Sequence, residues 1–184
     1  MKLSDGEKII IALLADIHKG LKIEGEIDVK GLMAAIYGGH LWSLKWDWTG
    51  LLHDYEADPA VVSQTTDILV MWSFLEQSFA NLSDDDKAKV CAANHGDAPK
   101  FPGFDGNNED HYGVAKHLIN EMGRFQNFKD HYLNSHSQRL DNYLLMFRVF
   151  DPIRDTVGLR PNVQMTADEI ISVLQAAYPA QAVA

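Results

Sequence analysis

Residues 58–82 read DPAVVSQTTDILVMWSFLEQSFANL and carry the clearest helix signal in the chain. Asp58 can accept hydrogen bonds from the free amides of a first turn, and Pro59 suits the first helical position because it lacks a donor there. Seven side chains follow at spacings of 4, 3, 4, 3, 4 and 3 residues, which places them on one stripe of a helix: Val61, Thr65, Ile68, Trp72, Leu75, Phe79 and Leu82. The pattern predicts a central core helix. The alternative, a coiled-coil dimer seam, has only three heptads to support it.

Three helices are expected before this segment. Ser4 and Glu7 form a Ser-x-x-Glu capping box that opens the first helix. Asp28 is a suitable cap for the second, and the Gly38–Gly39 pair closes it. A short third helix carries two tryptophans. The expected spans are 4–20, 28–39 and 40–48.

Further helices are expected after it. Ser83 and the acids behind it predict a helix that ends near Gly96, because acidic residues in a first turn favour the helix dipole. Another helix should begin at a cap near Asp105, and the next should run from about 137 to 150 and stop at Pro152. A capping box at 166–169 opens the last helix, which Pro179 closes before a short frayed tail after 178.

These signals divide the chain almost completely into helices. No run of four or more residues alternates strictly enough to indicate a strand. No linker or internal repeat divides the chain. We therefore expect an all-α fold, a single compact domain of about seven helices over residues 1–184.

The bulk composition limits the function classes. Hydrophobic residues make up 46% of the chain and charged residues 23%, as in an ordinary globular domain. The formal net charge of −10 disfavours binding to a phosphate backbone. Cys91 is the single cysteine, so no disulfide can form within the chain. No apolar run is long enough to span a membrane. These features predict a cytoplasmic protein.

Polar and charged residues gather in FPGFDGNNEDHYGVAKHLINEMGRF, residues 101–125. The alternation of oxygen-bearing side chains from Asp105 imitates a calcium loop, but positions six and twelve hold Asp110 and Lys116 in place of Gly and Glu. The chain contains no His-Glu-x-x-His, no Gly-x-Ser-x-Gly and no phosphate loop. We expect no metal, no cofactor and no catalytic residue, which leans against an enzyme.

The same segment supports two interpretations. Its polar side chains serve backbone geometry at a turn and a helix start, or they hold an anionic ligand through an arginine and carboxylates. The ligand-binding candidates under the second interpretation are Asp105, Glu109, His117 and Arg124. Gly123 also indicates a helix end or a close helix–helix approach, since glycine destabilises a helix interior by about 1 kcal/mol.

Large aromatic residues supply a second set of candidates. Side chains of this kind at helical spacing are usually core residues, but they also suit an interface between subunits. The interface candidates are Trp42, Trp46, Trp72 and Phe79.

The chain resembles the YfbU-like family of helical proteins. The residues that carry the resemblance are 67–72 and 78–82 in the central helix, Gly103-Phe104-Asp105 with Glu109 and Tyr112, Gly123-Arg124-Phe125 with Phe128, and the capped segment 165–170. It is good over about 58–177 and weaker before residue 58. It implies a helical fold, a bacterial or phage origin, a cytoplasmic location and self-association. It transfers no catalytic residue to this chain.

Three hypotheses remain open. The first is a self-associating interaction or regulatory module that uses the 58–82 helix or the Trp42–Trp48 surface. The second is a binder of a small anionic ligand, or an enzyme, with a site near Asp105 and Arg124. The third is a nucleic-acid-associated regulator in which short helices around Gly38–Gly39 act like a helix-turn-helix, a reading that the net charge opposes. We expect a homo-oligomer or a complex with another protein and no membrane partner, and the net charge disfavours nucleic acid.

Overall fold

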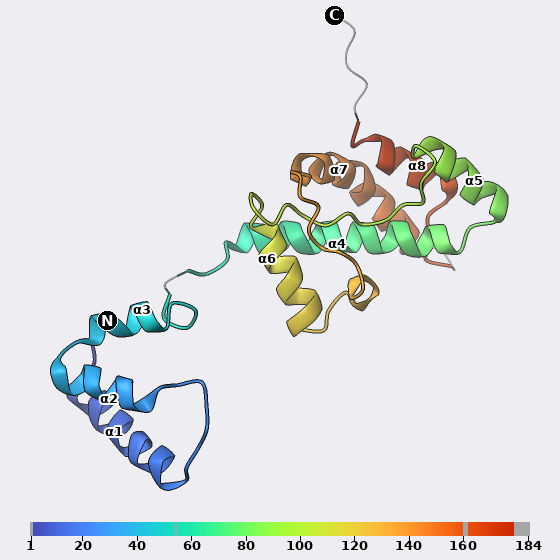
Figure 1. The fold of residues 1–184 in the computed structure, drawn as a ribbon. Coiled ribbons are helices and arrows are strands. Elements are labelled where there is room, and N and C mark those ends of the chain that lie inside the picture. The colour runs from blue at the N-terminus through green and yellow to red at the C-terminus, as the bar shows by residue number, and fades with distance from the viewer. Residues whose placement is uncertain (1, 54, 160–161, 179–184) are drawn as a thin grey trace, which may run out of the picture. The chain divides into compact units, whose positions relative to one another are not determined.

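The chain forms eight α-helices, α1 to α8, in the part that the computed structural model describes, residues 2–53, 55–159 and 162–178 (Figure 1). These residues contain no strand, only an isolated bridge between Phe104 and Asn134. The prediction of an all-α fold is confirmed, with eight helices in place of about seven. The chain divides into two compact units, Met1–Glu56 and Ala57–Ala184, which are described one at a time. A single domain over residues 1–184 stays a prediction.

The first unit contains the three helices α1 (Asp5–Gly20), α2 (Val29–Gly38) and α3 (Leu41–Asp47). The caps of α1 and α2 are those predicted. The Ser4–Glu7 capping box is complete, and Asp28 accepts a hydrogen bond from the N–H of Gly31. Gly39 ends α2 in the left-handed conformation, with φ of 72°. Helix α2 contacts both α1 and α3.

The second unit is built on α4 (Pro59–Ala80), which begins at Asp58 as predicted. Seven residues of α4 are buried, and four of them belong to the stripe read from the sequence: Thr65, Ile68, Trp72 and Leu75. Helices α6 (His111–Lys116), α7 (Leu140–Val157) and α8 (Ala167–Gln175) all contact it. The predicted central core helix is therefore confirmed.

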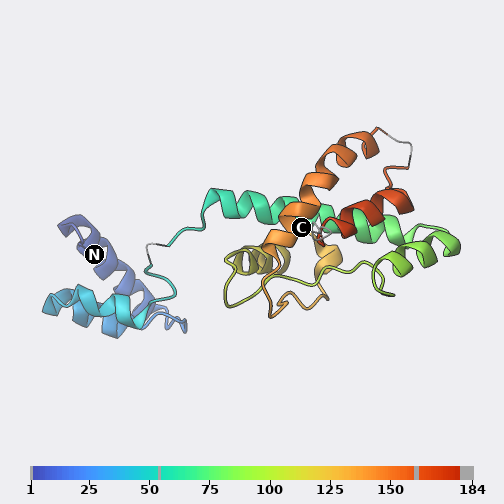
Figure 2. The same cartoon turned by 90° about the horizontal axis from the view of Figure 1, so that it is seen from above.

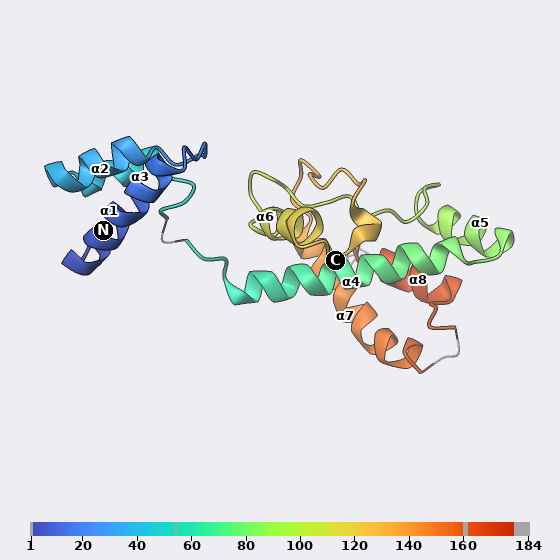
Figure 3. The ribbon, with the colours of Figure 1, turned by 90° about the horizontal axis from the view of Figure 1, so that it is seen from below.

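The remaining helices pack around α4. Helix α5 (Asp84–Ala93) lies beside α8, as Figure 2 shows. Figure 3 shows α6 on one side of α4 and α7 on the other. The capping box predicted for the last helix is present between Thr166 and Glu169. The predicted end at Pro179 and the tail after 178 lie outside the described residues.

Two predicted boundaries are wrong. Helix α6 begins at His111, not near Asp105, because Asp105 uses its side chain in a tight turn with Asn107 and Asn108. Helix α7 passes through Pro152 and ends at Val157. Val157 is buried in the core, so the packing of this last part of α7 outweighs the hydrogen bond that Pro152 cannot make.

Helix α6 continues into a single π-helical turn, His117–Glu121. Gly123 follows with φ of 64°, a left-handed conformation that suits glycine. The helix end expected near Gly123 is therefore confirmed.

Candidate functional site

Glu109 is a buried carboxylate, 9% exposed, that joins two segments far apart in the sequence. Its Oε2 accepts a 2.7 Å hydrogen bond from the N–H of Asp105. Its Oε1 accepts 2.7 Å hydrogen bonds from the N–H groups of both Arg139 and Leu140. These two amides lie at the start of α7, where free N–H groups and the helix dipole favour a negative charge. Glu109 thus acts as the cap of α7.

Asp105 is 3% exposed and binds within its own turn. It accepts hydrogen bonds from the N–H of Asn107 at 3.0 Å and from Nδ2 of Asn108 at 2.6 Å. The hydrogen bond from Asn108 is the main cause that holds the pKa of Asp105 below its ordinary value. The carboxylate oxygens of Asp105 and Glu109 are directed at groups of the chain itself.

His117 and Arg124 are exposed, in contrast to these two carboxylates. In the described part of the chain, no hydrogen bond or ion pair joins either side chain to Asp105 or Glu109. The four ligand-binding candidates are therefore two buried carboxylates on one turn and two exposed cation-forming residues at the end of α6. The contacts among the described residues do not bring these four side chains together into one site.

The four interface candidates also divide into two pairs. Trp42 and Trp46 are exposed on α3, with ring centroids 5.3 Å apart in an edge-to-face arrangement. Trp72 is 5% exposed and lies in the core of the second unit. Phe79 is half-buried and packs against that core. The free aromatic surface is thus the one on α3.

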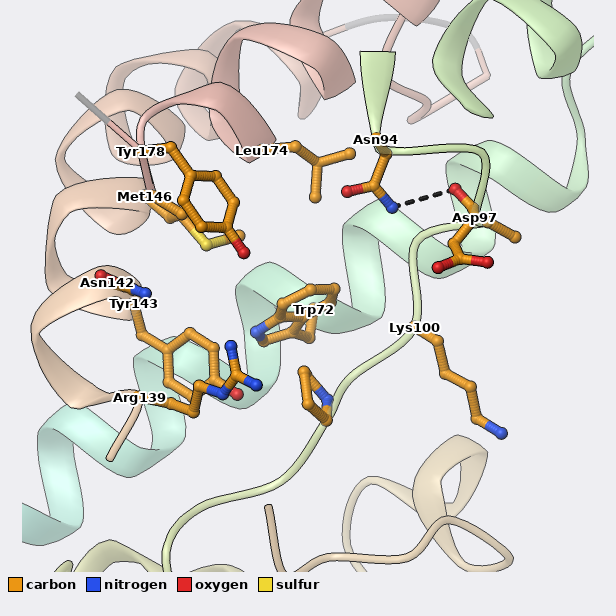
Figure 4. A pocket seen from close by; sticks show the side chains of 13 residues that line it. Trp72, Asn94, Asp97, Lys100, Arg139, Asn142, Tyr143, Met146, Leu174 and Tyr178 are labelled. Atoms are coloured by element: carbon orange, nitrogen blue, oxygen red, sulfur yellow. Dashed lines mark hydrogen bonds between the residues drawn. The ribbon is translucent and has the colours of Figure 1, made fainter. Parts of the chain in front are cut away.

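The second unit contains a pocket of about 520 Å³ between α4, α7, α8 and the segment 94–102 (Figure 4). Trp72 forms part of its wall, and the apolar side chains of Met146, Leu174 and Tyr178 form another part. A cavity of this size matches the usual range for small-molecule sites, about 300–1,000 Å³.

The charged groups of this pocket lie at different ends. Figure 4 shows Arg139 beside Tyr143 and the nitrogen-bearing edge of Trp72, whereas Asp97 and Asn94 lie on the far side of the Trp72 ring. The ammonium group of Lys100 points away from the centre. Within the described residues, neither Nε1 of Trp72 nor Nε of Arg139 has a hydrogen-bond acceptor.

Gly103 fixes the wall of the pocket formed by the 101–104 segment. Its φ is 89°, and a Cβ added there would lie 2.2 Å from the carbonyl oxygen of Leu133. The N–H of Phe104 donates to the same oxygen at 2.9 Å. The hydroxyl of Tyr143 donates to the carbonyl of Gly103 at 2.7 Å, and burial raises the pKa of Tyr143 above its ordinary value. The proline–glycine turn thus positions Pro102 at the pocket.

Two histidines are half or fully enclosed near this wall. His111 stacks on Phe104, and its Nε2 lies 3.1 Å from Oε1 of Gln64. Burial lowers the pKa of His111, which favours the neutral ring. His131 lies 3.6 Å from Glu76, whose other oxygen accepts from the N–H of Phe101 at 2.6 Å. Burial raises the pKa of Glu76. Both histidines therefore have structural neighbours.

Sequence reasoning missed Arg139 and Tyr143 as pocket residues. Tyr143 belongs to α7 and Arg139 directly precedes it. Both reach the pocket only because Glu109 and Gly103 join this part of the chain to a segment about thirty to forty residues earlier. The proline–glycine turn was the one local signal of that junction. Among the described residues, no group of three or more His, Cys, Asp or Glu side chains is placed to hold a metal ion. None of the helices in the described ranges is long and apolar enough to cross a membrane.

The first unit presents an apolar face on α1. Its five members are 54 to 62% exposed, and their spacings of 1, 3, 1 and 3 residues place them on one side of the helix: Ile9, Ile10, Leu13, Leu14 and Ile17. We call this set the α1 face. No residue of α1 is buried. Contiguous apolar surface of this kind is typical of an interaction site.

Comparison with known protein families identifies the chain's family. The sequence model of the YfbU domain matches residues 1–176, so the likeness covers the helices of the first unit as well as residues 58–176. No curated protein matches the chain.

Proposed function

The chain belongs to the YfbU family, and we propose that it is a self-associating module in which the α1 face pairs with the same face of a second copy. The observation that carries this proposal is a helix of sixteen residues without a buried side chain. A bacterial origin, a cytoplasmic location and a regulatory role remain predictions.

The first unit has little core of its own. Among its described residues, only Ala35 and Leu44 are buried. Small domains are marginal because they bury a low fraction of their surface. Covering one large aliphatic side chain stabilises a fold by about 1.5–3 kcal/mol. A partner that covers the α1 face therefore supplies stabilisation that the unit otherwise lacks.

A second copy of the chain is the partner that best fits this face. Most of the large apolar side chains that are exposed belong to the first unit. Those of the second unit are scattered over separate segments and form no matching stripe: Val62, Met122, Tyr132, Leu159, Val163 and Tyr178. The α1 face is thus complementary chiefly to itself, and a patch that meets its own copy produces a two-fold dimer.

The charges at the ends of α1 favour an antiparallel pair. Asp5 and Glu7 lie in its first turn, and His18 and Lys19 lie in its last. An antiparallel arrangement places the acidic end of one copy beside the basic end of the other, and it also opposes the helix dipoles. Ile9 and Ile17 each lie four residues from Leu13. A pair centred on Leu13 therefore matches Ile9 of one copy with Ile17 of the other.

The test is the molar mass of the full chain by light scattering at micromolar concentration. We expect twice the mass of 20.6 kDa for the wild type and the monomer mass for Leu13→Asp, because a charge at the centre of the pair is desolvated without a partner. Leu159→Asp is the matched control, since Leu159 is exposed in the second unit, and it should leave the dimer intact.

A wild type that is monomeric at high micromolar concentration contradicts the proposal. A dimer that survives Leu13→Asp contradicts the choice of the α1 face. The exposed Trp42 and Trp46 on α3 are then the next candidates for the interface.

A further inference from the structure

We propose that the pocket of the second unit binds a small organic carboxylate with an apolar body, and that Arg139 receives the carboxylate. This inference is independent of self-association, since every lining residue belongs to the second unit. It also differs from the site expected near Arg124, a residue that is exposed and does not line this pocket.

The carboxylate of Glu109 binds the backbone N–H of Arg139 and leaves the guanidinium without an ion pair among the described residues. This guanidinium is half-buried at the pocket. The polar groups that Figure 4 shows beside it, the indole N–H of Trp72 and the hydroxyl of Tyr143, carry no negative charge that would neutralise it. The Tyr143 hydroxyl donates its proton to Gly103. An anionic group at this point supplies the acceptor that the donors lack.

Asp97 limits the anion to the Arg139 end. Its carboxylate lies on the other side of the Trp72 ring, beside Asn94, whose Nδ2 donates to the carbonyl of Asp97 at 2.9 Å. A second negative charge there would repel a ligand carboxylate. The pocket thus has a positive charge at the Arg139 end and a negative charge at the Asp97 end. One anionic group fits this arrangement, and two do not.

The apolar walls define the rest of the ligand. The ring of Trp72 and the side chains of Met146, Leu174 and Tyr178 surround the space between the two polar ends. With a volume of about 520 Å³, the pocket is far larger than acetate or inorganic phosphate requires. A body that fills it and contacts the Trp72 face gains affinity from burial of apolar area.

The backbone of Arg139 is held in place before any ligand arrives. Its backbone N–H is bound by Glu109, and the next turn of α7 is tied to the opposite wall by Tyr143. A site whose groups are already ordered loses less entropy on binding. The buried polar residues of the 101–109 segment therefore support the ligand site without touching the ligand.

The test follows the indole N–H signal of Trp72 by nitrogen-15 NMR of the full chain. Trp72→Phe assigns this signal among those of the four tryptophans. The probes are 4-phenylbutyrate and its uncharged amide at millimolar concentration. We expect the acid to shift the Trp72 signal with an affinity at least about tenfold higher than that of the amide, since a charge-assisted pair with arginine is lost in the amide.

Variants of Arg139 complete the experiment. Arg139→Gln should weaken the binding of 4-phenylbutyrate about tenfold, and Arg139→Lys should retain part of it. The control is Arg148→Gln, an exposed arginine on the same helix, which should bind as the wild type does. The acid and the amide are compared in wild-type protein, so that comparison stands even if Arg139→Gln fails to fold.

Three results would overturn the inference. The first is an equal affinity for acid and amide, which means that the pocket takes any apolar body. The second is full binding by Arg139→Gln, which removes Arg139 as the receptor of the carboxylate. The third is an unchanged Trp72 signal with 4-phenylbutyrate, which means that the pocket does not take an organic carboxylate with an apolar body.

Discussion

The hydroxyl of Tyr143 donates a 2.7 Å hydrogen bond to the backbone carbonyl of Gly103, across forty residues of sequence. This bond joins α7 to the proline–glycine turn. The carbonyl belongs to a residue that lies against the backbone of Leu133, so three separate segments meet at one point. The pocket beside Arg139 depends on this junction, because two of its walls are the segments that the bond connects.

The first prediction concerns Gly103. Gly103→Ala forces a side chain into left-handed backbone and sets its Cβ 2.2 Å from the oxygen of Leu133. We expect a loss of at least about 2 kcal/mol in the free energy of unfolding, measured by urea denaturation. Gly113→Ala is the control, since a Cβ added at this helical glycine would meet no neighbouring side chain or segment within 4 Å. This substitution should raise the free energy of unfolding by about 0.5–1 kcal/mol. Equal effects of the two substitutions would falsify this account of the turn.

The second prediction concerns Glu109, which accepts three backbone hydrogen bonds. Glu109→Gln removes the negative charge. It also replaces one of the two accepting oxygens with an NH₂ group, which cannot accept a hydrogen bond from the backbone N–H groups that face it. We expect a loss of about 2–3 kcal/mol in the free energy of unfolding, because hydrogen bonds to a buried charge are strong and unpaired donors remain. Glu121→Gln, at an exposed glutamate, should change it by less than about 0.5 kcal/mol. A stable Glu109→Gln protein would mean that the cap of α7 is dispensable.

The third prediction is a pH dependence at Asp105. Its pKa in the folded chain lies below the ordinary value of 3.8, so the unfolded chain binds more protons between these two values. Its contribution to stability is therefore complete above about pH 3.8 and is lost as the pH falls through the folded pKa.

Urea midpoints at a series of pH values on both sides of 3.8 provide the measurement. Wild type and Asp105→Asn should differ most at neutral pH and converge in acid. Asp130→Asn, at an exposed aspartate, serves as the control for general charge effects. A constant difference between wild type and Asp105→Asn at every pH would show that the ionised carboxylate is not the stabilising species.

Helix starts were predictable from the sequence because their causes are local. The caps at Ser4, Asp28, Asp58, Ser83 and Thr166 act within three residues, and each is present in the structure. A side-chain oxygen that is close in sequence to free amides competes with few other partners. The stripe in α4 was also predictable from the sequence, since its spacing places the side chains on one face of the helix whatever packs against them.

The site was not predictable in the same way. Asp105 looks like a helix cap in sequence, yet two asparagines behind it offer closer donors and the helix begins later. Glu109 caps the start of α7, thirty residues later in the sequence, and helical or strand spacing patterns cannot predict a contact between residues so far apart. Arg139 faces a pocket only because these long-range bonds place it there. Sequence patterns identified the polar segment correctly but could not identify its partners.

The last prediction concerns Pro152, where a local rule failed. Proline has no N–H for the i−4 carbonyl, here that of Arg148, and its ring crowds that turn, yet α7 continues to Val157. Burial of Val157 and the 2.6 Å ion pair between Arg154 and Asp151 favour the continued helix. Pro152→Ala should therefore restore a hydrogen bond without changing the fold. We expect a gain of about 1–3 kcal/mol in the free energy of unfolding by urea denaturation. An unchanged or lower free energy of unfolding would mean that the packing of Val157 requires the backbone geometry that proline imposes at position 152.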